Sequence, residues 1–436
     1  MKKILFIQPP FERLMGYSRY YTNQGLLSLA AVVDEAGHQA IVYDADYDPN
    51  GKSYNALELL ENYNRYTIEM KEFNSIIWDE VRDVIKKYNP DFLGVCVLSP
   101  TLESGLKIIK IAREINKDIK IIVGGAHASL RPEDLVDCAD YIIQYEGESV
   151  IVDVLEGKIK DKIIKGPRIT NLDELPFPAI SDLHNLHLFE KRDLSLVMST
   201  RGCPFGCKFC DSPQLWHRRT TRKSVDYFIE EIKNIKEKYK VTDFYISDDS
   251  FSVNPSWLNE FCKQIKKLNV TWRCLDRIDS ITEEKILLLR DAGCRNLKLG
   301  IESGSQQILR KINKNITIED ILSADRILRK TNMDWSAFFM LGFPGETKED
   351  MLKTQNLIKI ISAKSVTLSI FTPYPGNELL TEHNTDYKLY SHHSPNNNFT
   401  GTMSNSDFNK ILVDTLDICE NNYFEHNIRK REGGIA

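Results

Sequence analysis

The chain has 436 residues, a formal net charge of −5, and 42% hydrophobic and 27% charged residues. At roughly 150 residues per domain, this length predicts two or three domains, and the composition is typical of globular proteins. A slightly acidic chain offers no broad basic surface for nucleic acid, so we expect small molecules or a carrier as partners.

The sequence contains no segment that indicates export or membrane insertion. The apolar run at residues 4–7 is too short for a signal peptide, and no run approaches the roughly 18 apolar residues of a membrane span. The nine cysteines are an odd number and are mostly scattered, unlike a disulfide framework. We therefore expect a cytoplasmic protein.

Residues 1–165 alternate short apolar runs with amphipathic stretches, which predicts an α/β domain with a doubly wound, Rossmann-like parallel sheet. Such a sheet binds ligands at the carboxyl ends of its strands. A polar stretch rich in Tyr and Asn at 46–75 is either a helical insertion or a lid. The expected strands are 3–8, 41–44, 92–98, 119–123 and 141–143, and the expected helices are 25–38 and 102–115.

Residues 166–193 form the expected linker. Pro167, Pro176 and Pro178 lie in it. Because proline restricts its own residue and the one before it, we expect this segment to cross between domains in extended form.

The alternation resumes over residues 194–376, which predicts a partial (β/α)6 barrel of the TIM type, with active groups at the carboxyl ends of its strands. The expected strands are 194–200, 243–247, 271–275, 296–300, 334–341 and 365–371, and the expected helices are 224–239, 255–268, 283–292, 318–330 and 348–361. Residues 377–436 read as a loop followed by a terminal helix at 404–431 and a disordered Gly-Gly tail. His392 and His393 in the loop fit solvated side chains better than metal ligands.

The most informative motif is Arg201-Gly-Cys-Pro-Phe-Gly-Cys-Lys-Phe-Cys210, in which Cys203, Cys207 and Cys210 are spaced C-x3-C-x2-C. Structural zinc needs four ligands, and His217 lies outside finger-like spacing. Three thiolates suit a [4Fe-4S] cluster with one iron left open. The alternative is three thiols in a structural loop. Cys262, Cys274 and Cys294 could hold a second cluster, but each lies in a helix or strand pattern, so we expect them to pack in the core.

The cysteine motif resembles the cluster loop of the radical S-adenosylmethionine (SAM) enzymes. The resemblance implies that Cys203, Cys207 and Cys210 hold a [4Fe-4S] cluster and that SAM chelates its open iron. One electron then cleaves SAM to a 5′-deoxyadenosyl radical. A low-potential cluster of this kind needs an external donor of the flavodoxin or ferredoxin type.

Motifs at the other strand ends resemble those of the same family. The resemblance implies that Glu302 and Ser303 meet the ribose or methionine part of SAM, that the backbone of Leu341 and Gly342 contacts its adenine, and that Asp249 and Arg277 lie in the cavity. The residues alone also allow structural roles. Asp248 and Asp249 could cap the helix near Pro255, Arg277 could pair with Asp276 or Asp279, and Glu302 could begin a helix.

About the first 150 residues resemble the cobalamin-binding domain that precedes many radical enzymes. The similarity lies in Gln8-Pro9-Pro10, Glu35-Ala36-Gly37-His38, Gly124-Gly125-Ala126-His127 and Glu146-Gly147-Glu148. The sequence lacks a D-x-H-x-x-G motif, so we expect no histidine on the lower face of cobalt. The candidate cobalamin-binding residues are Pro9, Pro10, Tyr17, Gly124, Gly125, His127 and Glu146.

These resemblances imply a cobalamin-dependent radical SAM methyltransferase acting on an unactivated carbon or phosphorus centre. It would use one SAM to methylate cobalamin and a second to make the radical. One alternative keeps both cofactors but catalyses a cyclisation or rearrangement. A more distant alternative is a non-catalytic iron-sulfur or cobalamin sensor. The sequence does not identify the substrate.

Overall fold

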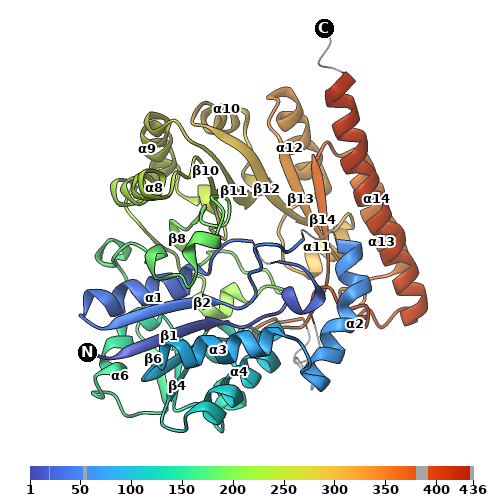
Figure 1. Cartoon of the computed structure of the whole chain (residues 1–436). Helices are drawn as coiled ribbons and strands as arrows, with labels where there is room; N and C mark the ends of the chain where they lie inside the picture. The colour runs from blue at the N-terminus through green and yellow to red at the C-terminus, as the bar shows by residue number, and fades with distance from the viewer. Residues whose placement is uncertain (19, 53–55, 380–390, 433–436) are drawn as a thin grey trace.

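The computed structural model describes residues 1–18, 20–52, 56–379 and 391–432. Two α/β halves pack against each other, with the amino-terminal half in blue to cyan and the carboxyl-terminal half in yellow to red (Figure 1). Within the described ranges, no helix is both long and apolar enough to cross a membrane.

The amino-terminal half contains a six-stranded, fully parallel sheet in the order β2-β1-β3-β4-β5-β6. Its strands are buried, apolar runs, as expected when helices cover both faces of a parallel sheet. They are β1 (Lys3–Gln8), β2 (Gln39–Asp44), β3 (Phe92–Cys96), β4 (Lys120–Gly124), β5 (Tyr141–Tyr145) and β6 (Ile163–Gly166).

Helices cover both faces of this sheet. Helices α1 (Gln24–Glu35) and α6 (Ile151–Leu155) share a core with one face, and this core continues into the carboxyl-terminal half. Helices α3 (Ile77–Tyr88) and α4 (Leu102–Ile115) bury their apolar stripes against the other face. The sheet is therefore doubly wound, as predicted, and a short helix α5 (Ala126–Leu130) follows β4.

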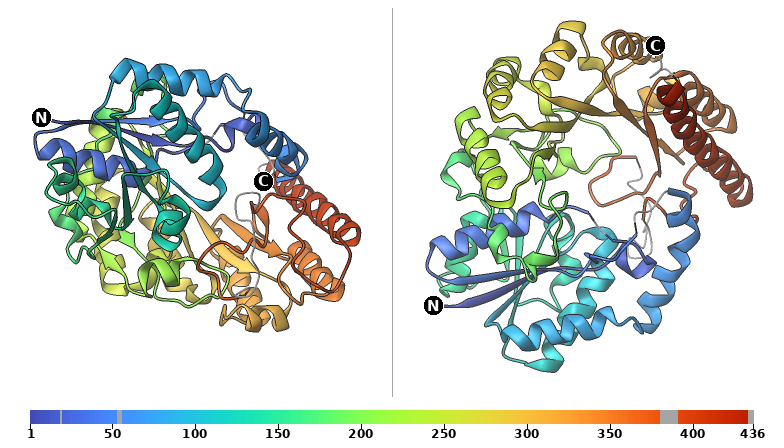
Figure 2. Two further views of the ribbon diagram at one scale, coloured as in Figure 1. Left: turned by 90° about the horizontal axis from the view of Figure 1, so that it is seen from below. Right: turned by 45° about the horizontal axis from the view of Figure 1, so that its top comes forward.

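The polar excursion at 46–75 contains helix α2 (Ala56–Glu72), so it is a helical insertion. Tyr63 and Tyr66 of α2 are fully buried, and the Tyr66 hydroxyl donates a hydrogen bond to Pro100 O at 2.6 Å. Helix α2 also contacts β14 and α14 of the other half, as both views in Figure 2 show for α14. It therefore ties the two halves together on the side away from α1.

The linker departs from the extended form that the sequence predicts. It contains three short 3-10 turns, Leu172–Glu174, Ile180–Asp182 and Leu186–Leu188. Ala179 N–H donates to Leu27 O at 3.0 Å and His184 N–H donates to Val42 O at 2.7 Å, so the linker docks on α1 and on the edge strand β2. Each proline restricts only itself and its predecessor, and docking decides the rest.

The carboxyl-terminal half is a six-stranded parallel sheet in the order β14-β13-β12-β11-β10-β7, which forms a partial barrel. Its strands are β7 (Leu196–Val197), β10 (Asp243–Ile246), β11 (Thr271–Arg277), β12 (Cys294–Glu302), β13 (Trp335–Leu341) and β14 (Ser365–Ile370). Its helices are α7 (Ser212–Trp216), α8 (Val225–Tyr239), α9 (Pro255–Ile265), α10 (Glu283–Asp291), α11 (Gln306–Lys311), α12 (Ile318–Lys330) and α13 (Lys348–Ile360).

The expected strand at 194–200 is broken in two. Strand β7 joins the barrel, whereas β8 (Thr200–Arg201) turns away and pairs antiparallel with β9 (Thr221–Arg222). The buried Asp248 carboxylate causes the break, because it accepts hydrogen bonds from the backbone N–H groups of Ser199 (2.7 Å) and Thr200 (3.0 Å). The chain thereby leaves the sheet immediately before the cysteine motif.

A long helix, α14 (Asn405–Glu432), ends the described chain and packs along β14 and α13 (Figure 1). Residues 380–390 of the expected loop and the expected Gly-Gly tail lie outside the described residues. His393 is buried, and burial lowers the pKa of His392 to about 4. The expectation of solvated histidines is therefore wrong, because the chain folds back over β14, where Ile370 N–H donates to His392 O at 3.0 Å.

Candidate functional site

The cysteine loop, residues 202–210, follows β8 at the mouth of the barrel. Gly202 has φ +88°, and a Cβ there would lie 2.2 Å from Arg219 O, so only glycine fits. Lys208 N–H donates to Ile312 O at 3.0 Å, and Asn313 Nδ2 donates to Gly206 O at 2.6 Å. The loop is thus anchored to the turn that follows α11.

Cys203, Cys207 and Cys210 are half-buried free thiols. Burial raises the pKa of Cys203, and raises that of Cys210 to about 12, so bound positive charge would be needed to hold them as thiolates. Among the described residues, no three His, Cys, Asp or Glu side chains converge on a point that would hold a single metal ion. A [4Fe-4S] cluster binds each cysteine through a different iron, so this three-thiol set fits a cluster better than one ion.

Arg277, at the end of β11, lies directly beside the cysteine loop. Its guanidinium sits 4.0 Å from the ring centroid of Phe205, and its Nη1 lies 3.9 Å from Cys207 Sγ. It also pairs with Asp279 at 2.9 Å, so the expected ion pair exists together with the contact to the loop. Arg277 therefore places a fixed positive charge beside a candidate cluster ligand.

Asp249 follows β10 and Glu302 ends β12, two strands that flank β11 in the sheet. The Asp249 carboxylate is exposed and accepts a hydrogen bond from Ser212 Oγ at 2.8 Å. Helix α9 is capped by Asn254, so the capping role considered for Asp248 and Asp249 is wrong. Glu302 is the last residue of β12, has φ +72° and pairs with Lys314 at 2.7 Å; it does not begin a helix.

The other barrel candidates are mostly committed to the fold. Ser303 is fully buried, and its Oγ accepts from Ser305 N–H at 3.1 Å. Leu341 O accepts from Phe371 N–H at 2.7 Å, and Gly342 N–H donates to Glu346 Oε2 at 2.7 Å. Contacts of these three residues with SAM stay predictions, and the Gly342 amide already has a partner.

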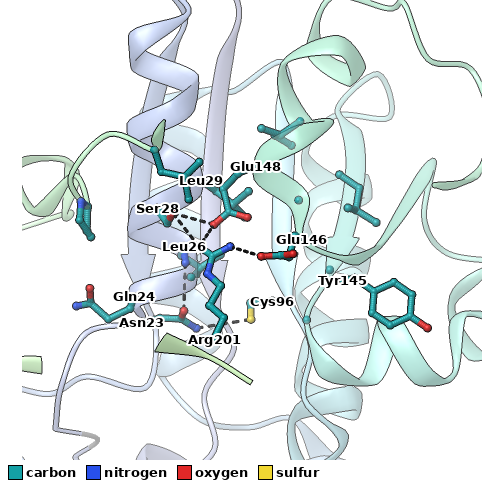
Figure 3. A pocket seen from close by; sticks show the side chains of 18 of the residues that line it. Asn23, Gln24, Leu26, Ser28, Leu29, Cys96, Tyr145, Glu146, Glu148 and Arg201 are labelled. Atoms are coloured by element: carbon teal, nitrogen blue, oxygen red, sulfur yellow. Dashed lines mark hydrogen bonds and ion pairs between the residues drawn. The ribbon is translucent and has the colours of Figure 1, made fainter. Parts of the chain in front are cut away.

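A cavity of about 470 Å³ lies between the two halves (Figure 3). Gly124, Gly125 and Glu146 line it, so three of the cobalamin-side candidates meet at the carboxyl edge of the first sheet. Apolar side chains of α1 and the sheet line the cavity on the amino-terminal side, among them Phe6, Leu29 and Ile122. We call this space the interdomain cavity.

Residues of the second half and the linker close the interdomain cavity. Met198, Thr200 and Arg201, which immediately precede the cysteine loop, lie in its wall together with Trp216. Linker residues Leu172, Leu175, Pro176 and Pro178 complete it. One cavity therefore borders both the first sheet and the chain leading into the cysteine motif.

The remaining cobalamin-side candidates do not line this cavity. Pro9 and Pro10 are buried after β1, and the Tyr17 hydroxyl accepts from Asn62 Nδ2 of α2 at 2.8 Å. The buried His127 ring lies between Ser99 Oγ (3.0 Å) and Asp134 Oδ2 (3.2 Å), and burial lowers its pKa. These contacts give Tyr17 and His127 structural partners away from the cavity.

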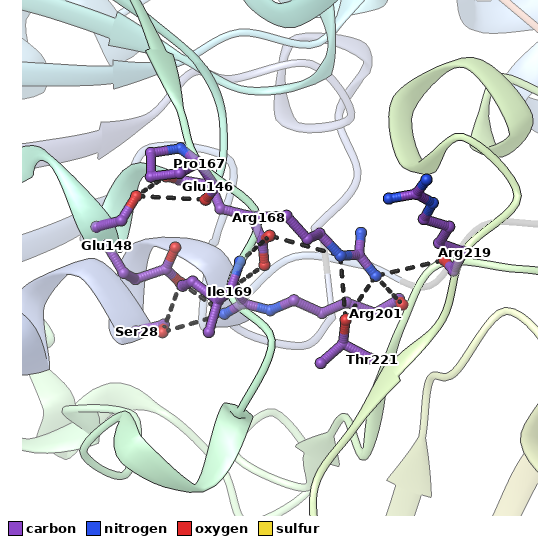
Figure 4. A network of polar contacts seen from close by, with 10 residues as sticks. Ser28, Glu146, Glu148, Pro167, Arg168, Ile169, Arg201, Arg219 and Thr221 are labelled. Carbon is purple, nitrogen blue, oxygen red and sulfur yellow. Dashed lines mark hydrogen bonds and ion pairs between the residues drawn. The ribbon is translucent and has the colours of Figure 1, made fainter.

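Sequence reasoning assigned no role to Arg201 and Glu148, although both stand in the quoted motifs. Arg201 bonds to Glu146 Oε1 at 2.8 Å and to Glu148 Oε1 at 2.6 Å, and Ser28 Oγ also donates to Glu148 at 2.8 Å (Figure 4). Burial would lower the pKa of Arg201, but the two carboxylates raise it, so the guanidinium stays charged. The sequence did contain a signal for this ion-pair network: an arginine directly before the cysteine motif, and two acidic residues directly after β5.

The three other cysteines considered for a second cluster are buried in the barrel wall. Cys262 lies on α9, Cys274 on β11 and Cys294 on β12, each 2% exposed or less. Burial raises the pKa of Cys262 to about 12. Their positions within regular elements favour core packing.

Family comparisons agree with this geometry. Residues 197–358 match the Radical SAM superfamily, and residues 17–155 match the B12 binding domain. These matches confirm that both expected domains are present. They also confirm the expected cofactors, because a radical SAM domain implies a [4Fe-4S] cluster and SAM, and a B12 binding domain implies cobalamin.

Individual relatives are distant. An uncharacterised methyltransferase of Pyrococcus horikoshii is 28% identical over 70% of this chain and 72% of its own length. The anaerobic magnesium-protoporphyrin IX monomethyl ester cyclase of Rubrivivax gelatinosus is 26% identical over 71% of this chain, which spans 61% of that enzyme. The radical SAM methyltransferase TsrM of Kitasatospora setae has a TM-score of 0.66 at 14% identity, covering 87% of this chain and 75% of that chain. This likeness confirms the predicted fold class.

Proposed function

The chain belongs to the radical SAM superfamily with a B12 binding domain ahead of its radical SAM domain, and on that basis we propose that it is a cobalamin-dependent methyltransferase. Its target would be an unactivated carbon or phosphorus centre. We set the domain limits at 1–165 for cobalamin, 166–193 for the linker, 194–376 for the radical SAM barrel and 377–436 for the terminal region.

The interdomain cavity is the observation that carries the proposal. It is lined on one side by Gly124 and Gly125 at the carboxyl edge of the first sheet, and on the other by Met198 and Arg201, just before Cys203. A methyltransferase of this kind needs its two cofactor sites close together with the substrate between them, since proximity is the protein's main contribution.

The chemistry of the cavity suits cobalamin with its nucleotide tail displaced. The depth is apolar, with Phe6, Leu26, Leu29, Ile122 and Ile143 in its walls, as an aromatic base would require. None of the described residues that line it is a histidine. This supports the expectation that no histidine reaches cobalt from below.

On the barrel side, Cys203, Cys207 and Cys210 would hold the cluster, with Arg277 beside it. Asp249 is exposed, whereas Glu302 is buried and paired with Lys314; both follow strands of the barrel, and we propose them as contacts for SAM. When bound, the cluster with SAM supplies the radical that abstracts hydrogen, and cobalamin carries the methyl group. Arg277 and the hydrogen bonds that Lys208 and Gly206 make with the turn after α11 would hold the three cysteines in place.

Two partners complete the proposal. The substrate is a small molecule or a carrier-bound group that enters from the barrel side, and the electron comes from an external protein of the flavodoxin or ferredoxin type. Among the described residues, no disulfide joins the cysteines, which favours a reducing compartment.

A second candidate function is cyclisation or rearrangement with the same cofactors, and the likeness to the Rubrivivax cyclase favours it. Coproducts separate the two functions. A methyltransferase yields one 5′-deoxyadenosine and one S-adenosylhomocysteine with each product, because methyl transfer to cobalt and radical formation consume separate SAM molecules. Product of unchanged carbon count with S-adenosylhomocysteine only at background would leave the cofactor assignments standing and reject methyl transfer.

A further inference from the structure

The inner face of the barrel is accessible, whereas its outer face is buried under helices. In β12, Leu297, Leu299 and Ile301 are fully buried, and the intervening Lys298 and Gly300 are partly exposed. In β13, Phe338 and Met340 alternate in the same way with buried neighbours. Side chains alternate across a strand, so Lys298 points into the concave side of the strands that Figure 2 shows curving around the barrel.

The other charges on this inner face have partners. Arg277 pairs with Asp279, and Glu302 pairs with Lys314. Arg273 pairs with Asp243 at 2.7 Å and donates to the Tyr21 hydroxyl at 2.8 Å. The charge of each of these groups is therefore neutralised by an opposite charge within the protein.

Lys298 is different. Within the described chain, its ammonium has no hydrogen bond or ion pair, and it lies 4.3 Å from the ring centroid of Tyr245. Burial, and then the charge of Arg273, lower its pKa to about 8. An ammonium held here without a counter-ion is less stable than one in water, and an incoming anion would stabilise its charged form.

The position of Lys298 relative to the cysteine loop suits a substrate anchor. Lys298 pairs with Leu275 in the β11–β12 register, and Arg277 lies two residues farther toward the carboxyl ends. Two residues of strand span about 7 Å. Lys298 therefore lies deeper in the barrel than Arg277, by two residues along the strand, and Arg277 contacts Cys207.

We infer that Lys298 binds an anionic group of the substrate, a carboxylate or a phosphate-type group, inside the barrel, leaving the reacting atom nearer the cysteine loop. This inference rests on the proposed function, since it names the substrate class of the same site. The SAM carboxylate has the same chemistry and is the competing source of the anion.

Binding of small anions to the protein loaded with its cluster and cobalamin, but without SAM, tests the inference. The probes are methylphosphonate, followed by 31P NMR line broadening, and 13C-labelled acetate, followed by 13C line broadening. At least one probe should broaden severalfold with the unsubstituted protein, keep most of that broadening with Lys298→Arg, and lose it with Lys298→Met. Lys353→Met, which removes an exposed lysine of α13 paired with Glu349, should leave the broadening unchanged.

Three results would overturn the inference. The first is that neither probe broadens with the unsubstituted protein. The second is equal broadening with Lys298→Met, provided its circular dichroism and cluster absorbance match those of the parent. The third is complete displacement of both probes by SAM, which would give the ammonium to SAM instead of the substrate. Formation of 5′-deoxyadenosine by the unsubstituted protein tests the radical SAM part of the proposed function separately, because it needs no anion at Lys298.

Discussion

Arg201 Nη2 lies 2.6 Å from Glu148 Oε1, so the residue two positions before Cys203 is bonded to the carboxyl edge of the cobalamin-binding sheet. Glu146 binds the same guanidinium, and its other oxygen accepts from the linker amide of Ile169 at 2.8 Å. Both carboxylates are almost fully buried, and Figures 3 and 4 show both of them beside Arg201. This network fixes the start of the cysteine loop relative to the other cofactor's domain.

Replacing Arg201 by Gln should therefore destabilise the protein strongly. Removing one partner of a buried charge network leaves uncompensated carboxylates and costs about 3 kcal/mol. Urea unfolding should show a much lower midpoint for Arg201→Gln than for Arg326→Gln, whose exposed pair with Glu319 contributes about 0.5 kcal/mol. Equal midpoints for the two variants would show that the network does not stabilise the protein.

Gly124 offers a test of the cobalamin site. A Cβ at Gly124 would meet only Ile143 O, at 3.6 Å, so Gly124→Ala should be tolerated. Gly124→Leu should fill part of the interdomain cavity and weaken cobalamin binding by roughly tenfold to a hundredfold, the equivalent of about 1–3 kcal/mol of overpacking. Equilibrium dialysis measures this, and equal affinities for the two variants would place cobalamin elsewhere.

The cobalt ligand is a third prediction. Since no described residue lining the cavity is a histidine and His127 is held by Ser99 and Asp134, cobalt should lack an axial nitrogen from the protein. The electron paramagnetic resonance spectrum of the bound Co(II) form should show no nitrogen superhyperfine splitting. Splitting from one axial nitrogen would mean that a histidine or the nucleotide base does reach cobalt.

Stability should also depend on Asp182 of the linker. Burial, and then the neighbouring Asp34, raise the pKa of Asp182 to about 7, above its unfolded value of about 3.9. Folding therefore takes up a proton, and the stability that this carboxyl contributes is present below about pH 4 and lost as the pH rises through about 7.

Asp182→Asn stays neutral at every pH, so its advantage over the parent should grow across that window. Because Asp182 is partly exposed, we expect a gain of only about 1–2 kcal/mol at neutral pH. Urea unfolding of both proteins at mildly acidic and mildly alkaline pH measures it. A gain that did not increase with pH would show that Asp182 is already ionised in the folded protein.

Much of this fold follows from local sequence. The apolar runs of β1, β3 and β4 are buried on both faces, so their composition alone indicates a parallel sheet. The cysteine loop is equally local, because its ligands and its Gly202 turn lie within nine residues of chain. These features needed no knowledge of distant contacts.

The sequence-based predictions were wrong where contacts between residues far apart in the chain determine the local structure. Asp248 breaks the strand before the cysteine loop from 48 residues away, and docking on Val42 folds the proline linker. His393 is buried by a polar loop that resembles a solvated one in composition. Arg201 and Lys298 received no role for the same reason. The position of Arg201 before the cysteine motif was visible in the sequence, but its pairing with Glu146 and Glu148 was not.

Metal and cofactor content of anaerobically reconstituted protein is the decisive measurement for the two cofactor sites. We expect one [4Fe-4S] cluster and one cobalamin per chain, with 5′-deoxyadenosine formed from SAM after reduction. The triple variant Cys203→Ala, Cys207→Ala, Cys210→Ala should stay folded and keep cobalamin, while losing iron, sulfide and 5′-deoxyadenosine formation. A triple variant that retained a full complement of iron and sulfide, or still cleaved SAM, would show that these three cysteines do not hold the cluster.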